Sequence, residues 1–316
     1  MKYVLVFLSV LITACAIDTD MDIQTSERIA RPAFMVERSI NNEQFQLQAW
    51  ERMHNRGQPA TIYIEDDGTA IEFSENQIDT VLLKSISNKD QRLIDPTPEN
   101  PVALHLASRD RSKNLAYLAR PCQFIKFPES KGCDASYWKE RRYTPEVVAA
   151  YQDALNDIAA RFDINGFHLV GYGGGANIAA VLAAKRDDVL SLRTVAGNLS
   201  PAFVNEYHDG KMPYATNSLL ATDFGEALSQ VPQHHFIGAA DQRIPPGSYH
   251  SYRQSIGLSD CISYSVVQDA DHERGWVQLW PQLLGIIPQC GEVFDDLPPL
   301  PPAPEFPGDF RKTKGK

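Results

Sequence analysis

The sequence has little positive charge, few cysteines and no metal-binding motif. Its 316 residues carry 30 Lys and Arg against 40 Asp and Glu, a net charge of -10, which argues against the basic face that nucleic-acid binding requires. There is no Cys/His cluster at zinc-ligand spacing and no calcium-loop motif, so we predict no metal and no cofactor. His234 and His235 are adjacent, but such a pair is more often a strand-edge or surface feature than a metal site.

An apolar segment at the amino terminus, residues 3–12, is too short to span a bilayer, which takes about 20 residues. Lys2 precedes it and the small residues Thr13 and Ala14 follow, as in an export signal peptide. Residues 11–15 resemble the lipobox of bacterial lipoproteins, in which the cysteine, here Cys15, becomes the lipidated first residue of the mature chain. An ordinary signal peptide cleaved nearby, with an incidental Cys15, is the alternative.

This resemblance and the composition along the chain predict four parts: a signal peptide over 1–14, a polar tether over 15–31, a globular domain over 32–292 and a proline-rich tail over 293–316. We expect the tail to be disordered or extended. Ala16 stands where lipoproteins retained in the inner membrane usually have aspartate. We therefore expect a lipid-anchored protein of the cell envelope, in the outer membrane and facing the periplasm.

Four cysteines remain besides Cys15, an even number that suggests two disulfides in an oxidising compartment. Four cysteines permit three connectivities. We prefer Cys122–Cys133 and Cys261–Cys290, because each of these closes a local loop. The alternative is four reduced, buried thiols, which suits an exported protein less well.

Apolar periodicity predicts an α/β domain. The predicted strands are residues 34–40, 45–52, 61–65, 114–119, 167–170, 190–195, 233–237 and 262–267. The predicted helices are residues 101–108, 144–162, 174–185 and 272 to about 287. Alternation of strands and helices in the second half implies a mostly parallel sheet with helices on both faces, and the antiparallel-looking start makes the sheet mixed. A polar segment, residues 198–230, is predicted as a small insertion over the site.

A glycine-rich turn at residues 171–175, G-Y-G-G-G, lies between a predicted strand and a predicted helix. It resembles the nucleophile elbow of α/β-hydrolases, G-x-S-x-G, with Gly171 and Gly175 as the outer glycines. Gly173 stands where that family has its nucleophilic serine. A phosphate-binding loop is the alternative, but no acidic residue follows about 20 residues on, as the dinucleotide fingerprint requires.

Two later segments resemble the other motifs of the fold, in the fold's order. Residues 235–245 look like the acid loop and contain Asp241, and residues 269–276 look like the histidine loop and contain His272. The resemblance covers residues 34–290 and implies the α/β-hydrolase fold, with Asp241 orienting the general base His272. Alternatively, Asp241 only caps a turn and His272 is a surface residue.

The resemblance also implies an oxyanion hole, half of it from the backbone N–H of Gly174. The other half would come from the turn after the strand at 61–65, at Asp66 and Asp67. Two carboxylates are a poor electrostatic environment for a developing oxyanion. With glycine at position 173 no acyl-enzyme can form, and loss of the serine of such an enzyme costs about 10⁶ in kcat.

Three functional hypotheses follow. The first is an impaired or inactive serine-hydrolase homologue, a lipid-anchored pseudoenzyme that binds a small ester- or peptide-like ligand. The second is an active esterase or peptidase-like hydrolase in which water or another nucleophile works with Asp241 and His272. Ser200, Ser218 and Ser248 lie in predicted loops, but none of them is on an elbow. The third is a non-catalytic envelope interaction protein that uses its proline-rich tail.

Overall fold

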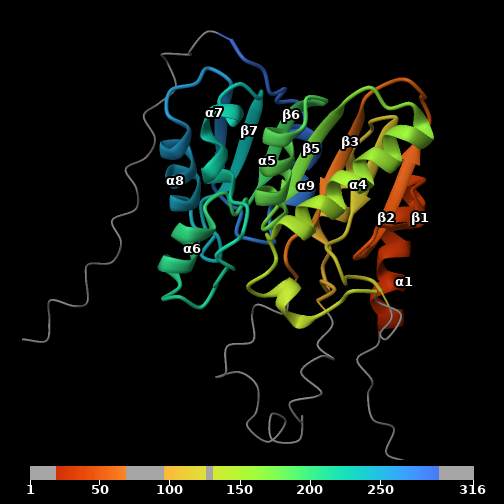
Figure 1. The fold of residues 1–316 in the computed structure, drawn as a ribbon. Helices are drawn as coiled ribbons and strands as arrows, with labels where there is room; N and C mark the ends of the chain where they lie inside the picture. Colours follow the sequence, from red (N-terminus) through yellow and green to blue (C-terminus); the bar gives the residue numbers. More distant parts are fainter. Residues whose placement is uncertain (1–18, 69–95, 126–130, 292–316) are drawn as a thin grey trace, which may run out of the picture.

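The computed structural model describes residues 19–68, 96–125 and 131–291, and the side chains from residue 23 onward. One eight-stranded sheet, of order β1-β2-β4-β3-β5-β6-β7-β8, organises these residues (Figure 1). The predicted signal peptide, the predicted lipidation site Cys15 and the proline-rich tail lie outside the described residues.

The sheet is mixed and mostly parallel, which confirms the α/β class predicted from the sequence. Strands β1, β2 and β4 pair antiparallel, and every other neighbouring pair in the sheet is parallel. The strands are β1 (Val36–Asn41), β2 (Gln46–Met53), β3 (Ala60–Ile64), β4 (Asn114–Leu118), β5 (Phe167–Tyr172), β6 (Val189–Val195), β7 (Gln233–Gly238) and β8 (Ile262–Val267). Every residue of β3 and β4 is buried, as expected for central strands covered on both faces.

Helices cover both faces of the sheet (Figure 1). They are α1 (Thr19–Ala30), α3 (Val102–Arg109), α4 (Pro145–Phe162), α5 (Gly175–Lys185), α6 (Pro201–Tyr207), α7 (Gly225–Leu228), α8 (Gly247–Ile256) and α9 (Trp276–Leu283), with short 3-10 turns η1 (Arg31–Ala33), η4 (Ala135–Trp138) and η5 (Ala221–Phe224). Helix α8 was not predicted from the sequence. The predicted insertion, residues 198–230, contains α6, η5 and α7.

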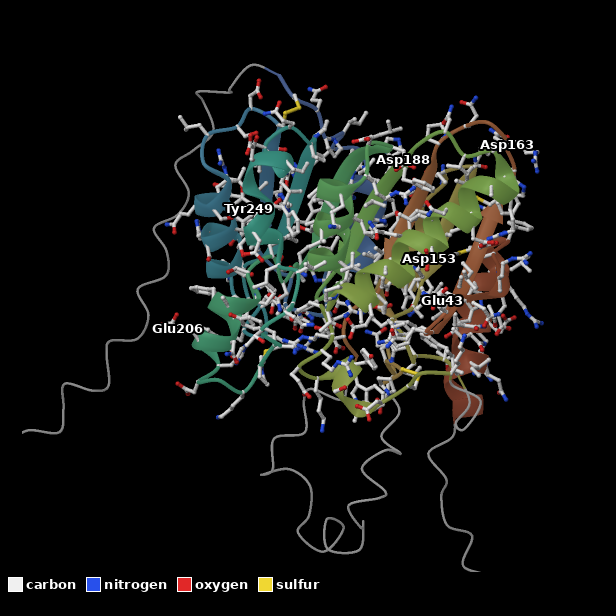
Figure 2. The ribbon with its side chains drawn as sticks, viewed as in Figure 1. Glu43, Asp153, Asp163, Asp188, Glu206 and Tyr249 are labelled. Atoms are coloured by element: carbon white, nitrogen blue, oxygen red, sulfur yellow. A yellow bond between two sulfur atoms is a disulfide. The ribbon has the colours of Figure 1, made fainter. Side chains whose placement is uncertain are left out.

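Alternate residues of the central strands enter two separate cores. In β3, Ile62 and Ile64 pack in the core beneath α4, α5 and α8, whereas Tyr63 packs in the core beneath α1, α3 and α9. Acidic side chains such as Glu43 and Asp153 remain exposed on the outside (Figure 2). The sheet is therefore packed on both faces, and the loops at the ends of its strands are the places where a functional site can form.

The segment predicted as a tether, residues 15–31, differs from that prediction where it is described. Residues Thr19–Ala30 form α1, which packs on the domain. Glu27 accepts a hydrogen bond from the indole N–H of Trp50 at 3.0 Å, and Ile29 packs against the core beneath α1, α3 and α9. The sequence did not predict this helix, because its few apolar residues form a helix face only when the rest of the domain supplies a surface for them to pack on.

Both disulfides have the predicted pairing, Cys122–Cys133 and Cys261–Cys290. The second joins the residue before β8 to the segment after α9, the next element along the chain. No helix in the described part of the chain combines the length and the apolarity needed to cross a membrane.

Candidate functional site

The glycine turn lies where β5 leaves the sheet and α5 begins. Gly173 has a left-handed φ of 51°. A Cβ on Gly171 would lie 2.5 Å from the Cα of Ala176, and a Cβ on Gly175 would lie 2.4 Å from the carbonyl oxygen of Ile64. Both outer glycines are therefore required by close backbone approach, because real Cβ contacts are essentially never that short.

Two carboxylates from the end of β3 cover the two inner glycines of this turn. A Cβ on Gly173 would lie 2.2 Å from Asp66 Oδ1, and a Cβ on Gly174 would lie 2.2 Å from Asp67 Oδ2. The space of a nucleophile side chain at position 173 is thus filled by the Asp66 carboxylate. Glycine at 173 and aspartate at 66 are sterically matched to one another.

His272 lies between Asp241 and Asp66. Its Nδ1 is 3.0 Å from Asp241 Oδ2 and its Nε2 is 3.1 Å from Asp66 Oδ2. The second oxygen of Asp241 accepts backbone N–H bonds from Arg243 at 2.9 Å and Ile244 at 2.8 Å. Asp241 therefore caps its own turn and also holds the imidazole, so that the two roles considered from the sequence occur together.

The predicted oxyanion groups come together, but they do not form an open hole. The Gly174 N–H donates to Asp66 Oδ1 at 2.5 Å, and the N–H of Asp66 itself donates to Glu65 Oε1 at 3.0 Å. The turn after β3 therefore brings a carboxylate to the elbow where the resemblance implied an N–H donor. The physical reason is steric: glycine at 173 leaves room for the longer Asp66 side chain.

Solved structures that are similar to this one include an esterase and a peptidase. An esterase from Pyrococcus furiosus matches with a TM-score of 0.51 and 10% identity, over 80% of this chain and 90% of its own. Est1E from Butyrivibrio proteoclasticus matches with a TM-score of 0.50 and 10% identity, over 78% and 95% of the two chains. An acylaminoacyl peptidase from Pyrococcus horikoshii matches with a TM-score of 0.51 and 9% identity, over 83% of this chain and 43% of its own.

The chain has the α/β-hydrolase fold. No family model and no curated protein matches the sequence. Identities near 10% establish the fold alone, so the chemistry of the site is argued from its own residues.

Electrostatics around the elbow of this α/β-hydrolase fold favour a fixed ion pair. Burial alone would lower the pKa of His272, but hydrogen bonds to Asp241 and Asp66 raise it to about 9. Burial would raise the pKa of Asp66, but Arg243, His272 and the Gly174 N–H hold it well below its ordinary value. At neutral pH the imidazolium donates both N–H groups to carboxylates, and it has no lone pair with which to accept a proton.

Asp67 is held by a second set of buried cations, which sequence reasoning missed. Arg120 Nη2 is 3.1 Å from Asp67 Oδ1, Arg142 Nε is 3.1 Å from Asp67 Oδ2, and the hydroxyl of Tyr143 donates to Oδ2 at 2.8 Å. All of these side chains are buried. No local signal marks this cluster, because its members come from the end of β3, the end of β4 and the loop before α4.

Glu65, which supports the Asp66 backbone, is fully buried. Burial raises its pKa to about 8, whereas the unfolded chain titrates near 4.5. Because the pKa of Glu65 is higher in the folded chain than in the unfolded chain, the protonated carboxyl favours the folded state. This contribution is fully present below pH 4.5 and is lost as the pH rises to 8. The full loss amounts to roughly 5 kcal/mol.

Glu65→Gln is therefore expected to gain stability relative to the wild type as the pH rises from 5 to 8, by several kcal/mol. The glutamine is neutral at every pH and keeps the side-chain shape. Urea unfolding of both proteins at the two pH values measures the difference, and the contribution of His272 cancels because both proteins contain it. Equal slopes against pH for the two proteins would show that Glu65 titrates normally.

His234 and His235 are interior residues of β7, which corrects the expectation of a strand-edge or surface pair. The two nitrogens of His234 lie 2.7 Å and 3.0 Å from the hydroxyls of Ser263 and Ser265. Those of His235 lie 2.8 Å from Thr194 Oγ1 and 2.9 Å from Gln233 Oε1. Burial lowers the pKa of both rings, and within the described residues no group of three or more His, Cys, Asp or Glu side chains is arranged to hold a metal.

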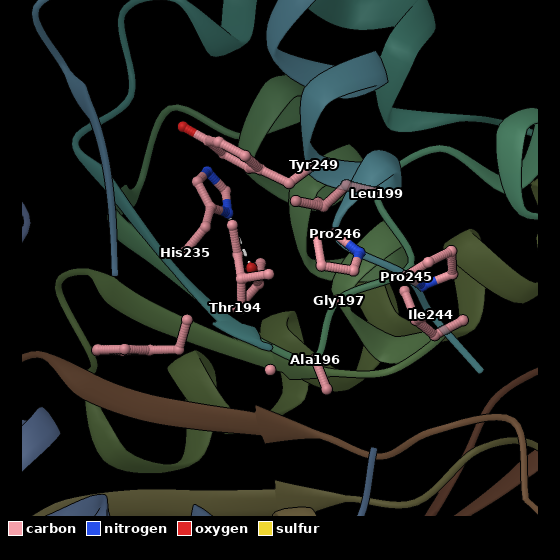
Figure 3. Close-up of a pocket in the computed structure, with 12 residues that line it drawn as sticks. Thr194, Ala196, Gly197, Leu199, His235, Ile244, Pro245, Pro246 and Tyr249 are labelled. Atoms are coloured by element: carbon pink, nitrogen blue, oxygen red, sulfur yellow. Dashed lines mark hydrogen bonds between the residues drawn. The ribbon is translucent and has the colours of Figure 1, made fainter. Parts of the chain in front are cut away.

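A small pocket lies between the ends of β6 and β7 and the start of α8 (Figure 3). Its wall includes Thr194, His235 and Tyr249 on one side and Ile244 and Pro245 on the other. Its volume of about 10 Å³ has room for about one water molecule. The pocket adjoins the Asp241 loop.

The alternative serine nucleophiles do not reach the imidazole. Ser200 Oγ lies 2.9 Å from Ser251 Oγ, and Ser248 Oγ accepts the backbone N–H of Ser200. Ser218 is in the insertion, and both ring nitrogens of His272 face carboxylates. None of the three serines is therefore placed as a triad member.

Proposed function

We propose that this protein is a lipid-anchored envelope protein that lacks serine-hydrolase activity and uses the former catalytic site to bind a small ester- or peptide-like ligand. The observation that carries the proposal is the position of the Asp66 carboxylate. It fills the space over Gly173, takes the Gly174 N–H and pairs with His272. Acyl transfer needs a nucleophile, an oxyanion-hole donor and a general base, and the Asp66 side chain occupies the position or contacts the group that each of them requires.

The charge state of His272 supports the absence of hydrolysis by activated water. General-base catalysis needs a neutral imidazole with a free nitrogen. The pKa of His272 is raised to about 9, by its hydrogen bonds to Asp241 and Asp66 against the opposing effect of burial. An imidazolium whose two N–H groups are both donated to carboxylates cannot act as a general base.

Export and anchoring are supported by the amino-terminal sequence and by the two disulfides. Helix α1 begins at Thr19, four residues after Cys15. At about 3.5 Å per residue, a lipid on Cys15 would hold the start of α1 within roughly 14 Å of the anchor along the chain. Incorporation of labelled palmitate into the wild type but not into Cys15→Ser, with fractionation of both between the inner and outer membranes, tests this part.

The catalytic part is tested by hydrolysis of short-chain aryl esters. We expect the wild type to hydrolyse them no faster than His272→Ala, since His272 is already protonated and paired. The comparison uses the full mature chain, with circular dichroism to show that both proteins are folded. Turnover by the wild type that is lost in His272→Ala would contradict the proposal and identify an active hydrolase with another nucleophile.

A further inference from the structure

We propose that the space over Gly173, beside the Gly174 N–H, is a binding site for a carboxylate group, and that Asp66 occupies this site from within the chain. This inference names the ligand chemistry of the site described above, and so it rests on the proposed function. The ligand class is a molecule bearing one carboxylate, the group that hydrolysis of an ester or a peptide leaves on its acid product.

The first argument is the convergence of donors on one carboxylate. Asp66 Oδ1 accepts the Gly174 N–H at 2.5 Å. Asp66 Oδ2 lies 3.1 Å from His272 Nε2 and 3.4 Å from Arg243 Nη2. One backbone donor and two cationic side chains therefore surround the two oxygens, and α5 adds the positive end of its dipole through Gly174. This is a set of groups that selects a monoanion with two oxygens.

The second argument is that other contacts hold these donors, so that they do not depend on Asp66 for their positions. The elbow fixes Gly174 by steric necessity at Gly171 and Gly175. His272 is held through Nδ1 by Asp241, and its carbonyl oxygen accepts the hydroxyl of Tyr172 at 3.0 Å. Removing the Asp66 side chain therefore leaves the Gly174 N–H and His272 Nε2 in place without the acceptor that they have in the wild type.

The third argument is steric. Asp66 Cβ lies 2.9 Å from the position of a Cβ on Gly173, and the carboxylate lies closer still. Because residue 173 has no side chain, the space over it can hold a carboxylate from elsewhere once Asp66 withdraws, and that carboxylate would take the Gly174 N–H beside Asp67, which lies over Gly174. A ligand must compete with a carboxylate that is tethered at high effective concentration, so its affinity for the wild type should be about 100-fold below its affinity for Asp66→Gly.

Acetate is the probe, and Asp66→Gly is the variant that opens the site. At 100 mM acetate we expect the Tm of Asp66→Gly to rise by about 3 °C above its value in equimolar sodium chloride. Acetamide, a neutral molecule of the same shape, should have no effect. The wild type should not respond to acetate, because Asp66 fills the site. The double variant Asp66→Gly/His272→Ala should not respond either, because it lacks the His272 donor.

An acetate response of Asp66→Gly no larger than that of the wild type would overturn the proposal. If Asp66→Gly does not fold alone, its refolding yield from urea in acetate against acetamide gives the same test, and the absence of rescue is again negative. The result is separable from the proposed function. An inactive wild type together with an Asp66→Gly variant that does not respond to acetate removes only the carboxylate site, whereas His272-dependent turnover by the wild type removes the proposed function.

Discussion

The double variant Asp66→Gly/Gly173→Ser is expected to hydrolyse short-chain aryl esters at least about 100-fold faster than either single variant. Serine at 173 alone has no room, since its Cβ would lie 2.2 Å from Asp66 Oδ1. Glycine at 66 removes that clash, frees the Gly174 N–H for an oxyanion and removes one of the two carboxylates that keep His272 protonated. Neither change by itself supplies all three conditions.

Glycine, not alanine, is needed at position 66. Asp66 Cβ lies 2.9 Å from the Cβ that serine would bring to Gly173, so Asp66→Ala/Gly173→Ser should remain clearly slower. The triple variant with His272→Ala is the control for mechanism and should return to the background rate. A folded double variant without activity would show that the elbow cannot act as a catalytic centre, and activity of Gly173→Ser alone would show that Asp66 moves aside.

Arg142→Met is expected to lower the free energy of unfolding by about 3–5 kcal/mol, because it removes one of the two buried cations that pair with Asp67 and leaves the carbonyl acceptors of Arg142 without their donor. Arg142 is 1% exposed and its Nε is 3.1 Å from Asp67 Oδ2. Its Nη1 donates to the carbonyls of Lys139 and Pro213. Methionine fills part of the volume but satisfies none of these acceptors, so the insertion and the elbow both lose a support.

The matched control is the neighbouring residue. Arg141→Met removes the same kind of side chain, but this arginine is 42% exposed and pairs at the surface with Glu146. Its cost should stay below about 1 kcal/mol. Urea denaturation of the two variants measures both values. If the two variants lose the same free energy of unfolding, the buried contacts of Arg142 with Asp67 contribute no more to stability than the surface pair of Arg141.

Some of the site followed from local sequence alone. The run G-Y-G-G-G between a strand and a helix placed the elbow, because Gly171 and Gly175 are required wherever a strand, a turn and a helix pass in contact. Apolar periodicity gave the strands and the mixed sheet, since a pleated strand alternates its faces whatever its partners are. The preference for short disulfide loops also led to the pairing Cys122–Cys133 that the structure contains.

Tertiary structure alone decided what fills the elbow. Asp66 and Gly174 are 108 residues apart in the chain, and only the parallel pairing of β3 with β5 brings them together. The sequence identified a missing serine and two unfavourable aspartates as separate oddities. The structure shows that they belong together, because the Asp66 carboxylate fills the space that a side chain at position 173 would need. The spacing of the residues in the sequence does not reveal which side chain fills that space.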